Sequence, residues 1–312
     1  MRPRVRSGLR AGAPPRPRAR LYRLAQSSPG PASALSSGSA ARQRRSPARS
    51  RGPVKKERER VAAMFKRYSE NRAMSQYEAF AEIYDEWSQH MTDDVAYYVD
   101  LAREADGPIV ELAVGNGRVA IPVARETGRK IIGIDLSPAM LAQARERTHA
   151  EGVDLELREG DMRDLALAEP AGLIYSPARS LLHLPNWQDR RRVFERVAAA
   201  LKPGGRFAWN AFVFDPLIAG RLSGEVQQHA ENSRIWQRVD YDPTESRIDI
   251  TVWLDRPGEG ERKLSLWWVS LAEWEGLTDV AGLDVEALYG DFDRRPFDKE
   301  SREFVWVTRK PT

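Results

Sequence analysis

A strand, a glycine turn and a helix follow one another within residues 108–147, and this stretch limits the possible folds more than any other part of the chain. The apolar run at 109–112 is typical of a buried strand, and a second strand is predicted at 131–134, before a helix that starts after Pro138. This order is a βαβ unit. The sequence therefore predicts an α/β fold built on a parallel sheet.

The turn itself predicts a ligand site. Gly115 and Gly117 have no Cβ, so the backbone there can bend sharply and approach a ligand closely. The unpaired N–H groups of the following helix face the same place. Asp135 lies just beyond the second strand, where a carboxylate can accept hydrogen bonds from a ribose diol. These features predict an adenosine-type ligand.

Two cofactor classes fit this pattern. Residues 115–120, GNGRVA, satisfy the G-x-G-x-x-G/A fingerprint of NAD sites. Glu111, however, ends the first strand, where an acid repels a pyrophosphate and suits an ammonium group. A further acid, Asp161, follows a third strand predicted at 153–157. Three acids around one pocket, including Asp135, favour a cationic ligand.

Four segments carry a resemblance to a known family. VELAVGNGR resembles the first motif of the class I S-adenosylmethionine-dependent methyltransferases, IIGIDLSPAML their ribose-binding segment, EGDMRDL their adenine-binding segment, and LKPGGRF the turn before their fifth strand. The resemblance covers residues 77–310. One departure is Ala113, where the family often has glycine, and we expect a slightly adjusted turn with intact binding.

The resemblance implies a Rossmann-like seven-stranded methyltransferase sheet with helices on both faces, its last strand antiparallel, and S-adenosylmethionine as cofactor. It also assigns cofactor contacts: Glu111 to the methionine ammonium, Gly115 and Gly117 to close backbone approach, Asp135 to the ribose, Asp161 with the Met162 backbone to the adenine, and Tyr84 to the methionine end. For Tyr84, ordinary core packing is an equal alternative. No catalytic residue is assigned.

The acceptor should approach where the fourth strand, predicted at 171–175, ends. The segment Ser176-Pro177-Ala178-Arg179 lacks the Pro-Pro-aromatic pattern of nucleic-acid amino-methyltransferases, which argues against a nucleic-acid substrate. Arg179 and His183 are candidates for contacting a polar small molecule, with an ion pair and a structural hydrogen bond as alternatives. Trp236 is a further candidate, with core packing as its alternative.

Other elements follow from periodicity. We predict one helix at 76–90 and another at 187–201 that Pro203-Gly204-Gly205 terminates. Residues 215–270 contain three runs with period-2 patterning, which predict a small antiparallel β extension that covers the substrate.

Composition divides the chain. Residues 1–60 hold 17 basic residues against Glu57 and Glu59, a net of +15, whereas the remainder holds 32 against 43, a net of −11. We predict a disordered Arg/Pro/Ser-rich tail at 1–63 and a methyltransferase domain at 64–312. The tail is interpreted as a nucleic-acid-binding arm, a transit peptide or a translated upstream region.

The chain contains no cysteine, and its four histidines stand at no metal-ligand spacing, so no metal is expected. Without a secretory signal or a membrane-length apolar run, a cytoplasmic enzyme is expected. We predict direct in-line methyl transfer to N or O of a small-molecule acceptor. The alternatives are an RNA- or protein-directed methyltransferase that uses the tail, and an NAD-dependent oxidoreductase. The sequence does not determine the oligomeric state.

Overall fold

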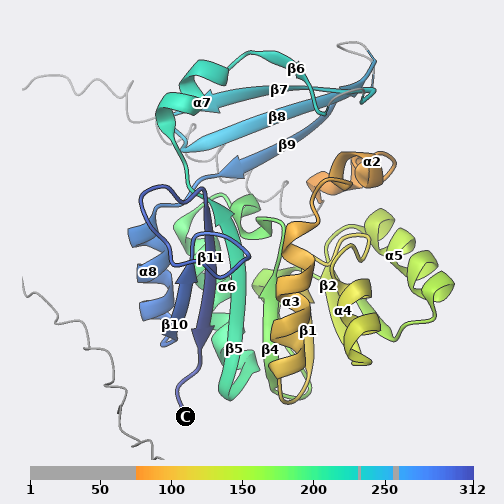
Figure 1. Ribbon diagram of the computed structural model, residues 1–312, viewed down its shortest axis with the longest axis vertical. Helices are drawn as coiled ribbons and strands as arrows, with labels where there is room; N and C mark the ends of the chain where they lie inside the picture. Colours follow the sequence, from red (N-terminus) through yellow and green to blue (C-terminus); the bar gives the residue numbers. More distant parts are fainter. Residues whose placement is uncertain (1–74, 231–232, 256–259) are drawn as a thin grey trace, which may run out of the picture. The chain divides into compact units, whose positions relative to one another are not determined.

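The computed structural model describes residues 75–230, 233–255 and 260–312. A central sheet of seven strands organises this part of the chain (Figure 1). In sheet order the strands are β10 (Asp284–Tyr289), β11 (Glu303–Arg309), β5 (Leu201–Phe212), β4 (Ala171–Ser176), β1 (Ile109–Leu112), β2 (Ile131–Asp135) and β3 (Leu155–Glu159). Strands β1 to β5 are parallel, and β11 is antiparallel to both of its neighbours. The predicted Rossmann-like sheet with an antiparallel last strand is confirmed. The tail predicted at 1–63 lies outside the described residues.

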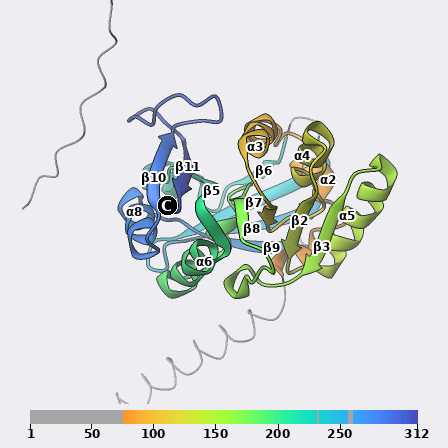
Figure 2. The ribbon, with the colours of Figure 1, turned by 90° about the horizontal axis from the view of Figure 1, so that it is seen from below.

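Helices cover both faces of this sheet, as Figure 2 shows in end view. One face packs against α3 (Asp93–Glu104), α4 (Ala120–Thr127) and Leu141 of α5 (Pro138–Glu151). The other face packs against α6 (Trp187–Ala200) and α8 (Leu271–Val280). Both faces are therefore buried, which is why β1 and β4 are buried along their whole length.

A second, antiparallel sheet follows β5. Its order is β6 (Val226–Gln228), β7 (Ile235–Asp242), β8 (Arg247–Leu254) and β9 (Arg262–Trp267). The predicted extension is confirmed in kind, but the predicted three strands were wrong in number. The short helix α7 (Pro216–Leu222) and β6 were missed, although Asp215 caps α7 and Pro216 begins it, which is a recognisable start signal.

The single helix predicted at 76–90 was also wrong. The structure has a 3-10 turn, η1 (Gln76–Ala79), and a short helix, α2 (Tyr84–Ser88), joined by a turn. Phe80 and Ile83 pack with the antiparallel sheet, whereas Ala81 and Tyr84 pack on Met140 of α5. A straight amphipathic helix presents one apolar stripe, so a segment that serves two cores must break.

Two boundaries differ from expectation. Helix α6 ends at Ala200 and β5 begins at Leu201, so Pro203-Gly204-Gly205 lies inside the strand and does not terminate the helix. The extra residues are taken up by a register shift between β4 and β5. Strand β3 starts at Leu155, two residues later than predicted, because Gly152 first ends α5 in a left-handed conformation.

Candidate functional site

The turn after β1 has the geometry that a close ligand requires. Gly115 and Gly117 have φ values of +57° and +84°, in the region that favours glycine. A Cβ on Gly117 would lie 2.7 Å from Cδ1 of Ile121. Ala113 also has a positive φ, 56°, so the alanine adopts the left-handed conformation at a cost of roughly 1–2 kcal/mol. The departure from the family pattern has left the turn in place.

Asp135 ties the end of β2 to this turn. Its Oδ2 accepts from the Gly115 N–H at 2.7 Å, and its Oδ1 accepts from the Ser137 N–H at 2.8 Å. The residue is 9% exposed, and burial raises the pKa of its carboxyl although these N–H groups oppose the rise. Each carboxylate oxygen has a second lone pair, so the group retains acceptor capacity toward a diol.

Glu111 is a buried acid with an unpartnered oxygen. It is 1% exposed on β1, and its Oε2 has no hydrogen-bond partner within the described structure. Burial raises the pKa of Glu111 to about 8, although the neighbouring Tyr175 hydroxyl and Arg118 oppose this rise. An unsatisfied buried carboxyl is costly, and an ammonium group would satisfy it.

Arg118, the residue directly after Gly117, was not singled out from the sequence. Its two terminal nitrogens each lie 2.7 Å from an oxygen of Asp94, in the first turn of α3, and it also donates to the carbonyl of Met91. The Asp94 side chain is buried, and the Arg118 side chain is partly buried. Burial raises the pKa of the Tyr84 hydroxyl, and nearby Arg118 lowers it in part, so these two side chains are neighbours.

The predicted adenine residues lie beside Asp135. The Gly160 N–H donates to the Asp135 carbonyl at 2.9 Å, which brings the chain after β3 to the end of β2. Asp161 caps the 3-10 turn η2 (Met162–Asp164), and its carboxylate binds the Arg163 guanidinium at 2.6–2.9 Å. Met162 is half-buried against the main core. The structure thus places both residues at the same edge of the sheet as Asp135.

The segment 75–91 crosses this edge. Glu78 accepts from the Ser137 hydroxyl at 2.5 Å and from the Ala139 N–H at 3.3 Å, at the start of α5. Asn116, buried in the glycine turn, donates to Asp85 at 2.6 Å. In the helix predicted at 76–90, Glu78 and Asp85 belong to the polar face. The sequence alone therefore does not distinguish them from charged side chains that are exposed to solvent.

His183 ends the 3-10 turn η3 (Ser180–His183), which follows β4. Its Nδ1 lies 3.1 Å from the carbonyl oxygen of Ser265 on β9, and its Nε2 lies 3.1 Å from the hydroxyl of Tyr77. A carbonyl only accepts, so Nδ1 carries the proton and Nε2 accepts from Tyr77. Burial lowers the pKa of His183 to about 4, so the ring is neutral at pH 7.

Arg179 and Trp236 have other surroundings. Arg179 forms a two-point ion pair with Glu303, at 3.1 and 2.8 Å, and its guanidinium lies over the Phe212 ring. It remains partly exposed at the end of β4. Trp236 follows Ile235, which packs toward η1 and α2. Successive residues of a strand point to opposite faces of the sheet, so the Trp236 side chain points away from the face on which Ile235 packs. Trp236 therefore does not lie with Tyr77 and His183.

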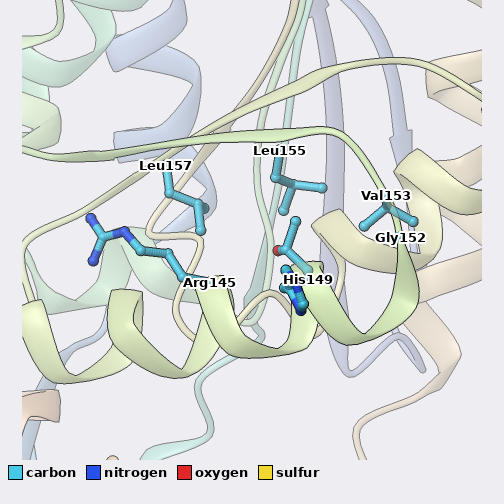
Figure 3. Close-up of a pocket in the computed structure, with 7 residues that line it drawn as sticks. Arg145, His149, Gly152, Val153, Leu155 and Leu157 are labelled. Atoms are coloured by element: carbon cyan, nitrogen blue, oxygen red, sulfur yellow. The ribbon is translucent and has the colours of Figure 1, made fainter.

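A separate hollow of about 410 Å³ lies between α5 and β3, lined by Arg145, Thr148, His149, Gly152, Val153, Leu155 and Leu157. Figure 3 shows the two leucines facing the helix that carries Arg145 and His149. Leu155 pairs with Ile131 at the beginning of β2, so the hollow adjoins the amino ends of the strands. Ligands of such sheets bind at the carboxyl ends, where Asp135 lies.

The described ranges contain no cluster of three or more His, Cys, Asp or Glu side chains suited to a metal ion. Within the same ranges, no helix combines the length and apolar character needed to cross a membrane.

Known proteins share this architecture. A family model described as a methyltransferase domain matches residues 109–205. The dTDP-3-amino-3,4,6-trideoxy-alpha-D-glucopyranose N,N-dimethyltransferase of Streptomyces venezuelae is 28% identical over 205 residues, which cover 63% of this chain and 84% of that protein. The cypemycin N-terminal methyltransferase of a Streptomyces species is 24% identical over 231 residues, which cover 68% and 87%.

Solved structures agree on the fold. The CcbJ methyltransferase from Streptomyces caelestis superposes with a TM-score of 0.67 at 24% identity, over 77% of this chain and 99% of that chain. Fold, glycine turn and relatives together define an α/β methyltransferase. The chain is an S-adenosylmethionine-dependent methyltransferase, with S-adenosylmethionine as its cofactor, and it has the fold of the class I enzymes that it resembles. The expected family, enzyme class and cofactor are confirmed, and the NAD-dependent alternative is set aside.

Proposed function

We propose that this enzyme methylates an amine nitrogen of a small-molecule acceptor. The observation that carries the proposal is the state of His183, whose two ring nitrogens are both engaged and whose pKa lies near 4. Such a histidine is a weak base for a hydroxyl proton. A neutral amine already has the lone pair that attacks a methyl group, so it needs no base before the attack.

The relatives support an amine acceptor. The similar proteins from Streptomyces venezuelae and Saccharopolyspora spinosa, 28% and 29% identical, are both described as N,N-dimethyltransferases of amino sugars bound to dTDP. An O-directed relative, 27-O-demethylrifamycin SV methyltransferase, is 26% identical over 166 residues, against 205 and 140 residues for the two N-directed relatives. This comparison and the engaged histidine favour nitrogen over oxygen.

The cofactor residues are proposed in the same way. Glu111 would pair with the methionine ammonium, Gly115 and Gly117 would let the backbone approach, and Asp135 would bind the ribose hydroxyls. Asp161, with the Met162 backbone, would border the adenine. When bound, the cofactor would supply a sulfonium methyl group: as the carbon–nitrogen bond to the acceptor forms in line, the carbon–sulfur bond would break and S-adenosylhomocysteine would leave.

The protein's contribution is then proximity, orientation and exclusion of water. We propose that residues 215–270 form the acceptor cover. Its strand β9 contacts both η1 and η3, and the Tyr77 and His183 side chains meet beside it. Arg179, which lies at the end of β4, is retained as a candidate acceptor contact.

The test uses pairs of acceptors that differ only in carrying an amino or a hydroxyl group at one carbon, with transfer measured by mass spectrometry. The amine should be methylated, and the rate at subsaturating acceptor should rise with pH until the amine is neutral. Methylation of the alcohol but not of the amine would contradict the proposal. A Glu195→Ala variant, altered on an exposed face of α6, serves as a handling control.

A further inference from the structure

Arg179 lies in a strained turn at the end of β4. Both Ala178 and Arg179 have positive φ values, 55° and 62°, in the left-handed region that a residue with a Cβ rarely adopts. Two such residues in succession persist only where their surroundings hold them. Strain of this kind is concentrated at functional sites, so the turn calls for an explanation beyond chain connection.

A buried polar group holds this turn. The Arg179 N–H donates to Oδ1 of Asn210 at 3.4 Å, and the Tyr98 hydroxyl donates to the same oxygen at 3.3 Å. Nδ2 of Asn210 donates to Oε1 of Glu303 at 2.6 Å. Asn210 and Glu303 are 3% and 7% exposed. The amide of Asn210 therefore fixes both the backbone of Arg179 and the carboxylate that binds its side chain.

The guanidinium of Arg179 is bound along one edge only. Its Nε and Nη2 donate to the two oxygens of Glu303 at 3.1 and 2.8 Å. Three of its five N–H groups, two on Nη1 and one on Nη2, therefore have no partner among the described residues. The Arg179 side chain is 42% exposed and that of Glu303 is 9% exposed, so a ligand can reach the free edge but not the carboxylate. The two-point contact fixes the direction of the free N–H groups.

This free edge lies on the acceptor side of the proposed site. Glu111 on β1 pairs with Tyr175 on β4, four residues before Arg179. Glu303 begins the antiparallel strand β11 opposite Phe212, so it lies at the carboxyl end of β5. The Phe212 ring centroid is 5.6 Å from Cζ of Arg179. Ligands of such sheets bind at the carboxyl ends of the parallel strands, which places the free N–H groups where an acceptor approaches.

We propose that Arg179 binds an oxyanion, a phosphate or a carboxylate, which the acceptor carries in addition to its amine, and that Asn210 and Glu303 are positioning residues for the guanidinium. This inference rests on the proposed amine acceptor and deepens it by naming a second group of the substrate. A guanidinium edge matches phosphate and carboxylate with two parallel hydrogen bonds. A purely structural ion pair would need neither the strained turn nor the exposed edge.

Short ligands test the oxyanion site without any methyl transfer. The full chain is loaded with S-adenosylhomocysteine and titrated calorimetrically with propyl phosphate, butyrate and butanamide, which share a propyl chain and differ in the head group. The wild type should bind the phosphate or the carboxylate about 10-fold more tightly than the amide, the scale of hydrogen bonds to a charged group at a partly exposed site. The anion that binds more tightly identifies the oxyanion of the acceptor.

Arg179→Met should reduce this preference to about 2-fold or less. Arg309→Met is the matched control, because Arg309 is 40% exposed, pairs with Glu286 and lies at the opposite end of β11. This control should keep the wild-type preference. Both variants retain residues 1–60, so anions that bind the basic tail contribute equally to both.

A second variant covers a failure to fold. Arg179→Met leaves the buried carboxylate of Glu303 without its cation, which destabilises a protein more than removing both charges does. The double variant Arg179→Met/Glu303→Gln removes both charges and should lose the preference as well.

A wild type that binds neither anion more tightly than the amide would overturn the inference. So would a preference that Arg179→Met or the double variant keeps when folded, because the ion pair would then only join β4 to β11. The amine proposal fails separately, in the test with paired amines and alcohols. Methylation of the alcohol alone would reject the amine acceptor and leave anion binding at Arg179 unchanged.

Discussion

Asp135 is the residue whose placement ties the turn to the proposed ribose site. Its carboxylate holds the Gly115 N–H and would also accept from the ribose. Asp135→Ala should weaken S-adenosylhomocysteine binding by about 1–3 kcal/mol, because a charged hydrogen-bond partner is lost. The measurement is isothermal titration. Asp284→Ala, on the exposed edge strand β10, should leave affinity unchanged, and unchanged affinity in Asp135→Ala would reject the ribose assignment.

Glu111 should make stability depend on pH. Its folded pKa, about 8, exceeds the ordinary value of 4.5, so the folded state holds a proton that the unfolded state releases. Stability should therefore fall as pH rises from about 4.5 to 8 and then level off. The full change corresponds to roughly 5 kcal/mol at most for this buried group.

Glu111→Gln removes this titration. The free energy of unfolding is measured with urea in the absence of cofactor. The value of this variant should rise relative to that of the wild type as the pH increases from 5 to 8.5. Glu195→Gln, a change in an exposed ion pair with Arg191, should show little such gain. A difference between Glu111→Gln and the wild type that stays constant with pH would show that Glu111 does not carry the raised pKa.

Sequence reasoning located single residues when a local pattern marked them. Glu111 and Asp135 end strands next to a glycine turn, and that pattern is contained in about thirty residues. The contact between Tyr77 and His183 joins positions 106 residues apart, and the protonation of His183 depends on Ser265, a further 82 residues along the chain. No short pattern reports such contacts.

At the scale of elements, β4 passes so close to the loop before β1 that a side chain has no room. A Cβ on Gly172 would lie 1.8 Å from the carbonyl oxygen of Asp106. Gly172→Ala should therefore destabilise the fold by about 1–3 kcal/mol or more, measured by urea unfolding. Gly220→Ala in α7, where a Cβ meets nothing within 4 Å, is the control. Equal stability of the two variants would contradict the close packing.

Helices and strands that pack on one hydrophobic core were predicted well from the sequence. A segment that packs on two cores was not. The buried run of β1 and the alternating run of β8 each have one pattern. The segment 76–90 packs on two cores, so its apolar residues imitate a single helical stripe while the chain breaks at 80–83. In the sequence, Pro203-Gly204-Gly205 has the composition of a helix end. Only the pairing of β5 with β4 shows that it is an irregularity within a strand.

At the scale of the whole molecule, charge separates the tail from the enzyme. The tail alternative requires the arginines of residues 1–60 for catalysis, whereas the proposed site lies within residues 75–312. Deleting residues 1–60 should therefore leave cofactor affinity and amine methylation unchanged. Activity should also depend weakly on salt. Loss of activity on deletion, together with a steep salt dependence, would favour the RNA- or protein-directed alternative.

The most direct test of the account is isothermal titration of the full chain with S-adenosylmethionine, S-adenosylhomocysteine and NADH in parallel. The glycine turn, the unpartnered Glu111 oxygen and Asp135 predict binding of both adenosyl ligands and no binding of NADH. Binding of NADH alone would contradict the account, because it would mean that the acids at this edge of the sheet tolerate a pyrophosphate.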